Sequence, residues 1–530
     1  MTKPTDNKLN TKAAGIVGLA VMCSRILGLV REQVFAALFG GGRAMDAFTV
    51  AFRTPNLLRD MFAEGALSTA FVTTFSKKIA TEGDESAWKL ASKFATLTIV
   101  FLSVVVLAGI GIAPLLVKFF APGFDPEKAA LTVLLARIMY PFILLVSLAA
   151  LAMGMLNARN VFGVPSMASS FFNIGSILGG VGVGYWIDPH FGTRALIGLA
   201  VGTLIGGAMQ LLVQIPSLRK VGFLFRPDFA WKDEGVKTIL GLMGPAIIAA
   251  SSVQLNVMIN TMFASNLGDG PIFWLQIAFR LMQLPLGIFG VAIGTVTLPV
   301  LSRSIAAGNV IEFRQNLARG MRLAFLLTIP STIGLMLLAE PIISVLYQHG
   351  KFTAAATAQA AGALEFYALG LVAYSSMKVL VPAFYAMDKR TTPMHVSFLS
   401  IGVNLLLNWI FTFRLGLGHR GLALSTGCVA LTNFAILYWL MRRETRLLET
   451  RALVGLLARL AVPCALLAGI CWAARAYPLH AWPTMHFTPK LAWLGGTIGL
   501  AGLAFFGSAA LFGIAEIDDL LAVVKRKLRR

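Results

Sequence analysis

SRILGLVREQVFAALFGGGRAMDAFTVAFRTPNLLRDMFAEGALSTA, residues 24–70, is the stretch around which the rest of the chain is organised. Its apolar segments are long enough to cross a bilayer. They nevertheless carry charged side chains, among them Arg25, Arg31, Asp46, Arg53, Arg59 and Glu64. A charge inside a bilayer costs roughly 3 kcal/mol or more unless it faces a polar cavity or a partner. The stretch therefore predicts a membrane protein that handles something charged.

The composition of the whole chain supports this class. Apolar residues make up 57% of the 530 residues and charged residues 13%, and the mean hydropathy is +0.77. That leaves too little polar surface for a water-soluble globule of this length. Apolar windows recur from Ala13 to the C-terminus without a long polar interval. We expect one polytopic, all-α membrane domain and no soluble catalytic domain.

The net charge of +21 indicates topology rather than nucleic-acid binding, because the basic residues gather in alternate connections. We predict about fourteen transmembrane helices of about twenty residues or more. The polar start, MTKPTDNKLNTKAAG, leads into an arginine-bearing span and not into a cleavage site, so we expect a cytoplasmic N-terminus. An even number of spans returns the basic C-terminal tail to the cytoplasm. The connections expected on that side contain Lys77–Lys78, Arg219–Lys220, Arg303–Arg319, Lys389–Arg390 and Arg442–Arg451.

An internal repeat divides the chain. FAALFGGG from Phe35 is echoed by FASNLGDG from Phe263, and VAFR ending at Arg53 by IAFR ending at Arg280. The copies lie about 227 positions apart. An even number of spans between them gives both halves the same orientation, related by a pseudo-two-fold axis along the membrane normal. We predict an N-terminal lobe over residues 1–230, a C-terminal lobe over residues 231–445, and two extra spans with a basic tail over residues 446–530.

The arginines are the candidate binding residues. A guanidinium group is always charged, and its forked donors match phosphate oxygens, so Arg25, Arg31, Arg53, Arg59 and Arg280 together favour an anionic cargo. Asp46 and Glu64 are expected to pair with them, either as gating groups or as fixed ion pairs. Arg53 either faces the central cavity or pairs with Asp46, and the sequence weighs these alternatives equally. The four cysteines show no metal-ligand spacing, and we predict no metal site and free buried thiols.

Glycines predict close helix packing in the first half. Gly198, Gly202 and Gly206 recur every four residues on one predicted span, and Gly175, Gly179 and Gly180 form a similar group on the span before it. Small residues at this spacing let two helix backbones approach closely.

Several fragments resemble one known family. SRILGLVRE, PNLLR, APGF at Ala121, FRLMQLPLGIFGVAIGTVTLPVLSRS from Phe279, YQHGKFT from Tyr347 and VPAFYAMDKRTTP from Val381 are similar to the MurJ/MviN family of the multidrug/oligosaccharidyl-lipid/polysaccharide exporter superfamily. The resemblance implies a lipid II flippase in which Arg25, Arg31, Arg59 and Arg280 line a central cavity, with Asp46 also important. Phe279 and Gln283 stand where acidic residues are expected in some relatives, so a proton relay through them is in doubt. A sodium site known among some relatives cannot be assigned, although Asn404 and Asn408 are candidate ligands.

The sequence thus predicts a transporter that moves undecaprenyl-diphosphate-linked peptidoglycan precursor from the cytoplasmic to the periplasmic leaflet of the bacterial inner membrane by alternating access. The last two spans are expected to hold the prenyl tail. The alternatives are an exporter of another lipid-linked oligosaccharide and a drug/cation antiporter, although an antiporter should show more cavity carboxylates than arginines. An enzyme acting on the same lipid would need convergent catalytic groups, which the sequence lacks. We expect no cofactor, leave sodium, proton and membrane-potential coupling open, and expect lipid II, membrane lipids and the cell-wall synthesis machinery as partners.

Overall fold

The structure is a computed structural model, and it describes residues 11–60, 68–477, 482, 485–514 and 516–517. Helices account for nearly all of these residues, and no strand occurs among them. Ten helices in this part of the chain are long and apolar enough to cross a membrane, or eleven if the bent pair formed by Ala354–Ala368 and Leu371–Ala386 is one span. The all-α, polytopic prediction is confirmed, and fourteen spans remain a prediction.

The chain forms two compact units, Met1–Asp269 and Gly270–Arg530. The described helices of the first unit are α1 (Thr11–Phe39), α2 (Arg43–Arg59), α3 (Ser68–Glu82), α4 (Asp84–Phe120), α5 (Pro126–Met139), α6 (Phe142–Ala158), α7 (Gly163–Ile187), η2 (Thr193–Ala195), α8 (Leu196–Leu212), α9 (Ile215–Lys220) and α10 (Glu234–Ser265). The helix α10 lies beyond the predicted lobe boundary at residue 230 but packs on α3 and α4. That boundary concerns the sequence repeat, and it remains a prediction.

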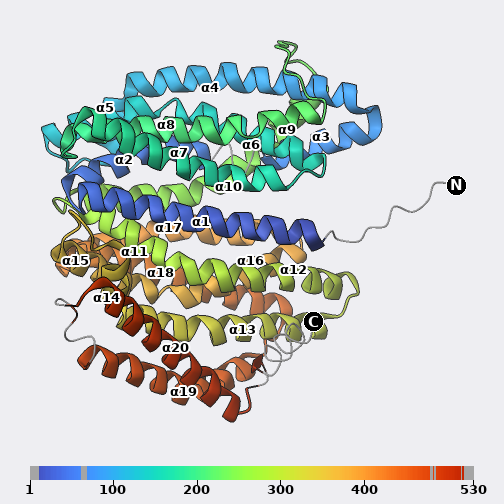
Figure 1. The fold of residues 1–530 in the computed structure, drawn as a ribbon. Coiled ribbons are helices and arrows are strands. Elements are labelled where there is room, and N and C mark those ends of the chain that lie inside the picture. The colour runs from blue at the N-terminus through green and yellow to red at the C-terminus, as the bar shows by residue number, and fades with distance from the viewer. Residues whose placement is uncertain (1–10, 61–67, 478–481, 483–484, 515, 518–530) are drawn as a thin grey trace. The chain divides into compact units, whose positions relative to one another are not determined.

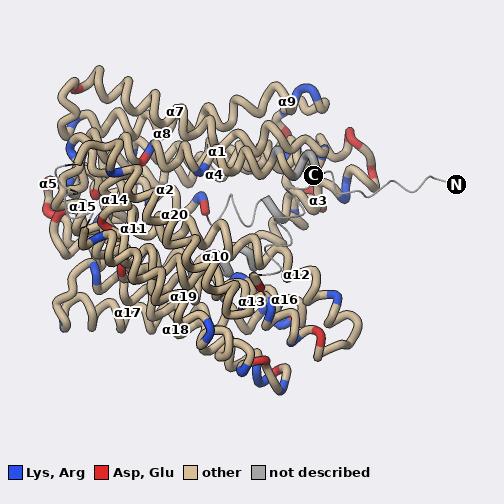
Figure 2. Tube along the Cα trace, turned by 60° about the horizontal axis from the view of Figure 1, so that its bottom comes forward, with Lys and Arg blue, Asp and Glu red and all other residues tan. Residues whose placement is uncertain are grey.

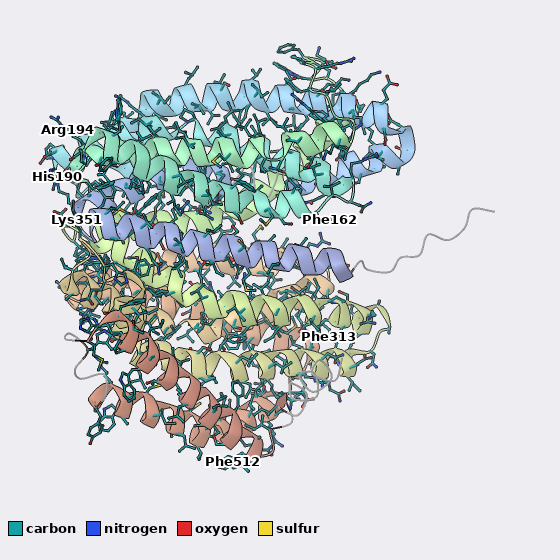
Figure 3. The ribbon with its side chains drawn as sticks, viewed as in Figure 1. Phe162, His190, Arg194, Phe313, Lys351 and Phe512 are labelled. Atoms are coloured by element: carbon teal, nitrogen blue, oxygen red, sulfur yellow. The ribbon has the colours of Figure 1, made fainter. Side chains whose placement is uncertain are left out.

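Local sequence signals explain where helices of the first unit begin. Asp125 caps α5 by accepting a hydrogen bond from the Lys128 backbone N–H at 3.1 Å, and Pro126 occupies the first helical position, where no N–H is needed. Asp233 caps α10 in the same way through the backbone N–H of Gly235. Figure 3 labels Phe162 and His190, which mark the two ends of α7.

The glycines of α7 and α8 confirm the predicted close packing. A Cβ atom added at Gly202 would lie 2.3 Å from the Gly180 backbone nitrogen, and one at Gly198 would lie 2.2 Å from that of Gly184. At Gly206 the nearest atoms belong to Ser176 and Phe172 of α7. No side chain fits at these positions, so the two helix backbones lie in direct contact.

The second unit contains α11 (Pro271–Pro285), η3 (Leu286–Gly290), α12 (Val291–Ala306), α13 (Val310–Leu337), α14 (Ala339–Tyr347), α15 (Ala354–Ala368), α16 (Leu371–Ala386), α17 (Thr391–Trp409), η4 (Ile410–Arg414), α18 (Gly418–Thr445), α19 (Thr450–Ala476) and α20 (Phe487–Leu511). The segments η3 and η4 are single π-helical turns. The segment η3 follows Pro285, whose missing N–H removes a helical hydrogen bond.

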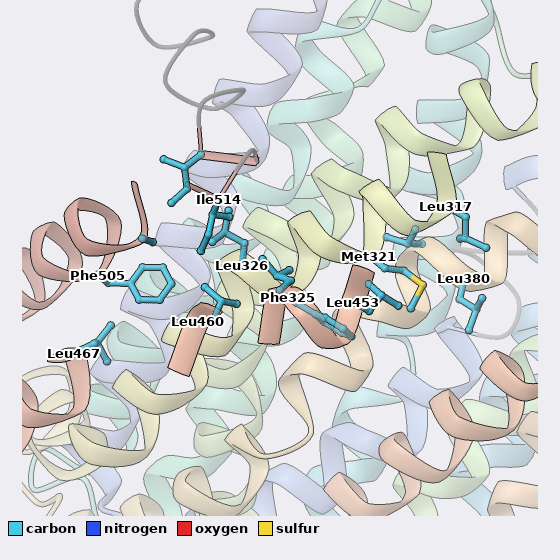
Figure 4. Close-up of a cluster of buried hydrophobic side chains, with 14 of the residues drawn as sticks. Leu317, Met321, Phe325, Leu326, Leu380, Leu453, Leu460, Leu467, Phe505 and Ile514 are labelled. Atoms are coloured by element: carbon cyan, nitrogen blue, oxygen red, sulfur yellow. The ribbon is translucent and has the colours of Figure 1, made fainter. Parts of the chain in front are cut away.

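A large apolar core joins the last two long helices to the rest of the second unit. Figure 4 shows Phe325 and Leu326 of α13 near Leu460 of α19 and Phe505 of α20, and all of these side chains belong to one buried cluster. In Figure 1 the helices α19 and α20 lie side by side, and both contact α13. The two C-terminal helices are therefore packed into this unit and do not form a separate body.

The repeat is visible in the local structure of its two copies. Helix α1 is followed by a break at Gly40, which has a φ of 78°, and by α2 with Arg53 and Pro55. Helix α10 is followed by a break with Gly268 at a φ of 89°, and by α11 with Arg280 and Pro285. Positive φ angles favour glycine, which explains the glycines shared by the two breaks.

Candidate functional site

The predicted arginines and Asp46 lie on α1, α2 and α11. Figure 2 shows that acidic and basic residues gather mainly towards the ends of the helices, as expected for spans that cross a bilayer.

Arg25 and Arg31 lie on the single continuous helix α1. Arg25 is exposed and Arg31 is half-buried. The Arg31 guanidinium lies 5.0 Å from the centre of the Phe172 ring on α7, a cation–π distance. Glu32, beside Arg31, is buried with 5% exposure. It is a buried acid that sequence reasoning missed, although it stands within SRILGLVRE.

Arg53 links α2 to α10. Its Nη1 atom donates a hydrogen bond to the Thr261 hydroxyl, which itself donates to the Val257 carbonyl at 2.7 Å. Thr261 is 1% exposed, so the hydroxyl is fixed within the unit.

Arg59 is held by the next residue in the chain. Its Nη2 and Nε atoms lie 2.7 and 3.1 Å from Oδ1 of Asp60. The other carboxylate oxygen of Asp60 accepts hydrogen bonds from Asn56 at 3.3 Å and from Gln254 of α10 at 3.1 Å. Asp60 was not among the predicted site residues. Its place directly after Arg59 was the available signal, but the contact with Gln254 is 194 positions away and was not predictable from the sequence.

Asp46 is fully buried, with 0% exposure, and its side chain lies 3.1 Å from the ammonium group of Lys128 on α5. Lys128 is 2% exposed and also lies 2.8 Å from Asp269. Its ammonium group is 4.1 Å from the centre of the Phe124 ring. Sequence reasoning placed Asp46 with the arginines and did not single out Lys128.

A second ion pair lies beside this cluster, at the same turn of the chain. The guanidinium of Arg43 donates to both oxygens of Asp125 at 2.6 and 2.5 Å. These hydrogen bonds hold the pKa of the Asp125 carboxyl well below its usual range. Together, Lys128 and Arg43 fix the segment Asp125–Lys128 to the start of α2.

The remaining predicted residues receive less support from geometry. Glu64 lies outside the described residues. Arg280 is half-buried on α11. Next to it, the Phe279 ring packs edge-on against Tyr367 with ring centres 5.3 Å apart, and Gln283 is exposed. The role of Arg280 and of the other predicted arginines in binding remains a prediction.

The two asparagines considered for sodium are both buried on α17. The amide nitrogen of Asn408 donates to the Asn404 amide oxygen at 3.1 Å. Within the described residues, no three His, Cys, Asp or Glu side chains come together as a metal site. Cation coupling therefore remains a prediction. The four cysteines are free thiols, of which Cys471 is buried.

The fold defines a class, that of polytopic helical membrane proteins. The solved inward-facing structure of a multidrug resistance MATE family transporter of the MOP superfamily has a TM-score of 0.67 to this chain. It covers 82% of this chain and 98% of its own, at 14% identity, and so supports the fold alone.

Closer matches give the family. The family model described as lipid II flippase MurJ matches residues 35–492. The probable lipid II flippase MurJ of Vibrio cholerae is 34% identical over 99% of this chain and 100% of its own length. A solved structure of lipid II flippase MurJ in an inward closed conformation has a TM-score of 0.76 and 25% identity over 95% of this chain and 99% of its own. This chain belongs to the lipid II flippase MurJ family. It is a transporter and not an enzyme, and a multi-pass protein of the inner membrane.

Proposed function

We propose that this chain translocates lipid II, the undecaprenyl-diphosphate-linked peptidoglycan precursor, from the cytoplasmic to the periplasmic leaflet. The observation that carries the proposal is the match over nearly its full length to a relative named as a probable lipid II flippase. Transport by alternating access of two lobes is supported by the likeness to the solved lipid II flippase MurJ in an inward closed conformation.

The arginines give this function a physical basis. The diphosphate of the cargo is strongly anionic, and a guanidinium fork forms paired, charge-assisted hydrogen bonds to phosphate oxygens. In a water-poor cavity such bonds are not replaced by solvent. Arg25, Arg31, Arg53, Arg59 and Arg280 are the residues proposed to hold the diphosphate, while the prenyl chain stays in lipid along α19 and α20.

The orientation and energy source complete the proposal. The alternation of basic connections supports a cytoplasmic position for both termini. The membrane potential is worth about 2.3 kcal/mol per charge per 100 mV and acts directly on a cationic cavity. Vesicles with an imposed potential, sodium gradient or proton gradient would separate the three driving forces. Contacts with the cell-wall synthesis machinery are a further part of the proposed role.

The proposal is tested with purified protein in vesicles that contain labelled lipid II. We expect Arg25→Ala, Arg31→Ala and Arg280→Ala to abolish translocation, and the corresponding lysine variants to restore it only partly, because lysine keeps the charge but lacks the fork. Arg226→Ala, at an exposed loop position, is the matched control and should be fully active. The amount of each variant in the membrane is measured in parallel. Full activity of all three alanine variants would overturn the role of the arginines, and chemical turnover of lipid II instead of translocation would overturn the function.

A further inference from the structure

We propose that Asp60 is the counter-ion that the cargo displaces from Arg59, and that this displacement opens one of the two side-chain contacts between α2 and α10. This proposal rests on the proposed transport of lipid II. It adds a structural change in the first unit that occurs only when the cargo is bound.

The contacts of Asp60 are the first observation. One carboxylate oxygen accepts from Nε and Nη2 of Arg59, at 3.1 and 2.7 Å. The other accepts from the side-chain amides of Asn56 and Gln254, at 3.3 and 3.1 Å. Both oxygens are thus engaged at once. The Asp60 and Arg59 side chains are 23% and 21% exposed, so the pair is shielded but still accessible to a ligand.

The chemistry of the pair makes it exchangeable. The edge of the guanidinium formed by Nε and Nη2 is the one that binds a carboxylate or a phosphate, and it holds one such anion at a time. Asp60 follows the last residue of α2 as its C-cap. The Arg59 guanidinium is the charged group among the contacts of Asp60, so the Asp60 carboxylate depends on Arg59 for its stabilisation. A diphosphate carries more negative charge than a carboxylate and repels Asp60 as it takes the edge of Arg59.

A second observation shows what such an exchange would move. Arg53 of α2 bonds to Thr261 of α10, and Asp60 at the end of α2 bonds to Gln254 of α10. The two positions on each helix are seven residues apart, which is about two turns and the same helix face. The two contacts therefore connect the facing sides of antiparallel helices. One is made by Arg53 itself, and the other is made by Asp60, which also binds Arg59.

The helix α10 is well placed to pass on this change. It ends at Ser265, four residues before the end of the first unit at Asp269, and the chain then enters the second unit. When the cargo binds Arg59, Asp60 loses its charged partner and the hydrogen bond between Asp60 and Gln254 breaks. The segment that leads into the second unit is then less restrained by α2.

The first test uses Asp60→Asn, which keeps the size of the side chain and removes its charge. In vesicles, we expect the dissociation constant for lipid II to fall roughly tenfold, because Arg59 is no longer held by a charged partner. We expect translocation to slow by a similar factor, because binding no longer triggers opening of the contact between residue 60 and Gln254. Asp228→Asn, in the loop before α10, is the matched control and should change neither quantity. Gln254→Leu should leave the dissociation constant within about twofold and still slow translocation.

A second measurement does not depend on changing Asp60. Asn56→Cys and Gln254→Cys are combined in a variant without the four native cysteines, and disulfide cross-linking is measured with and without lipid II. We expect lipid II to lower the yield, because positions 56 and 254 both lie against Asp60 in this structure and should separate when the cargo displaces Asp60 from Arg59.

The outcomes separate the two proposals. If the unmodified protein fails to translocate lipid II, the proposed function is wrong. If the unmodified protein translocates lipid II, either of two results would show that the counter-ion role of Asp60 is wrong while the function stands. The first is that Asp60→Asn changes neither the affinity for lipid II nor the translocation rate. The second is that lipid II leaves the cross-linking yield unchanged.

Discussion

Replacing Lys128 by methionine is expected to cost about 3–5 kcal/mol of unfolding free energy, because it leaves the Asp46 carboxylate buried without its counter-ion. Asp46 is 0% exposed and Lys128 2% exposed, so water cannot solvate the remaining charge. Methionine is close to lysine in volume, which keeps the packing contribution small. The second partner, Asp269, is half-exposed at 47%, and its share is about 0–1 kcal/mol.

A double-mutant cycle tests the origin of this loss. The double variant Lys128→Met with Asp46→Asn removes both buried charges, so we expect it to be more stable than Lys128→Met alone. The measurement is reversible unfolding in mixed detergent micelles, followed by helicity. Lys237→Met is the control, because Lys237 forms an exposed pair with Glu234 and should stay within about 0.5 kcal/mol of the unmodified protein. A loss below about 1 kcal/mol for Lys128→Met, or no recovery in the double variant, would refute the reasoning.

Three further predictions follow from separate features. Gly202→Ala should destabilise the protein by about 1–3 kcal/mol, because its Cβ would lie 2.3 Å from the Gly180 nitrogen, whereas Gly182→Ala, with nothing within 4 Å, should be nearly neutral in the same unfolding measurement. Arg43 lowers the folded-state pKa of Asp125. The stability from this pair is therefore complete above the ordinary carboxyl pKa, and it is lost as the pH falls from there through the lowered value. The difference in thermal stability between the unmodified protein and Asp125→Asn should shrink as the pH is lowered from 7 to 3. Arg53→Cys and Arg280→Cys, in a background without native cysteines, should react comparably with a membrane-impermeant thiol reagent and be protected by lipid II; an unreactive position 53 beside a reactive position 280 would contradict the symmetric cavity.

The sequence by itself determined the class of the protein, its all-α membrane fold and its family. These features depend on local properties, namely the hydropathy of windows of about twenty residues, the spacing of glycines and the order of motifs. The contact between α7 and α8 was predictable for this reason, since Gly198, Gly202 and Gly206 leave only one way for a neighbouring helix to approach so closely. The arginines were likewise evident, because a charge in an apolar segment stands out in the sequence alone.

Only the tertiary structure decided which partner each charge takes. Asp46 lies seven positions before Arg53, on nearly the same helix face, but its buried partner is Lys128, which is 82 positions away. Arg53 bonds to Thr261 across 208 positions, and Asp60 to Gln254 across 194. Ion pairs and hydrogen bonds depend on atoms within about 3 Å of one another, and helix packing alone brings such distant residues together. Hydropathy and residue spacing do not specify which side chains of α2 face those of α5 and α10. The roles of Lys128 and Asp60 were therefore identified only from the tertiary structure.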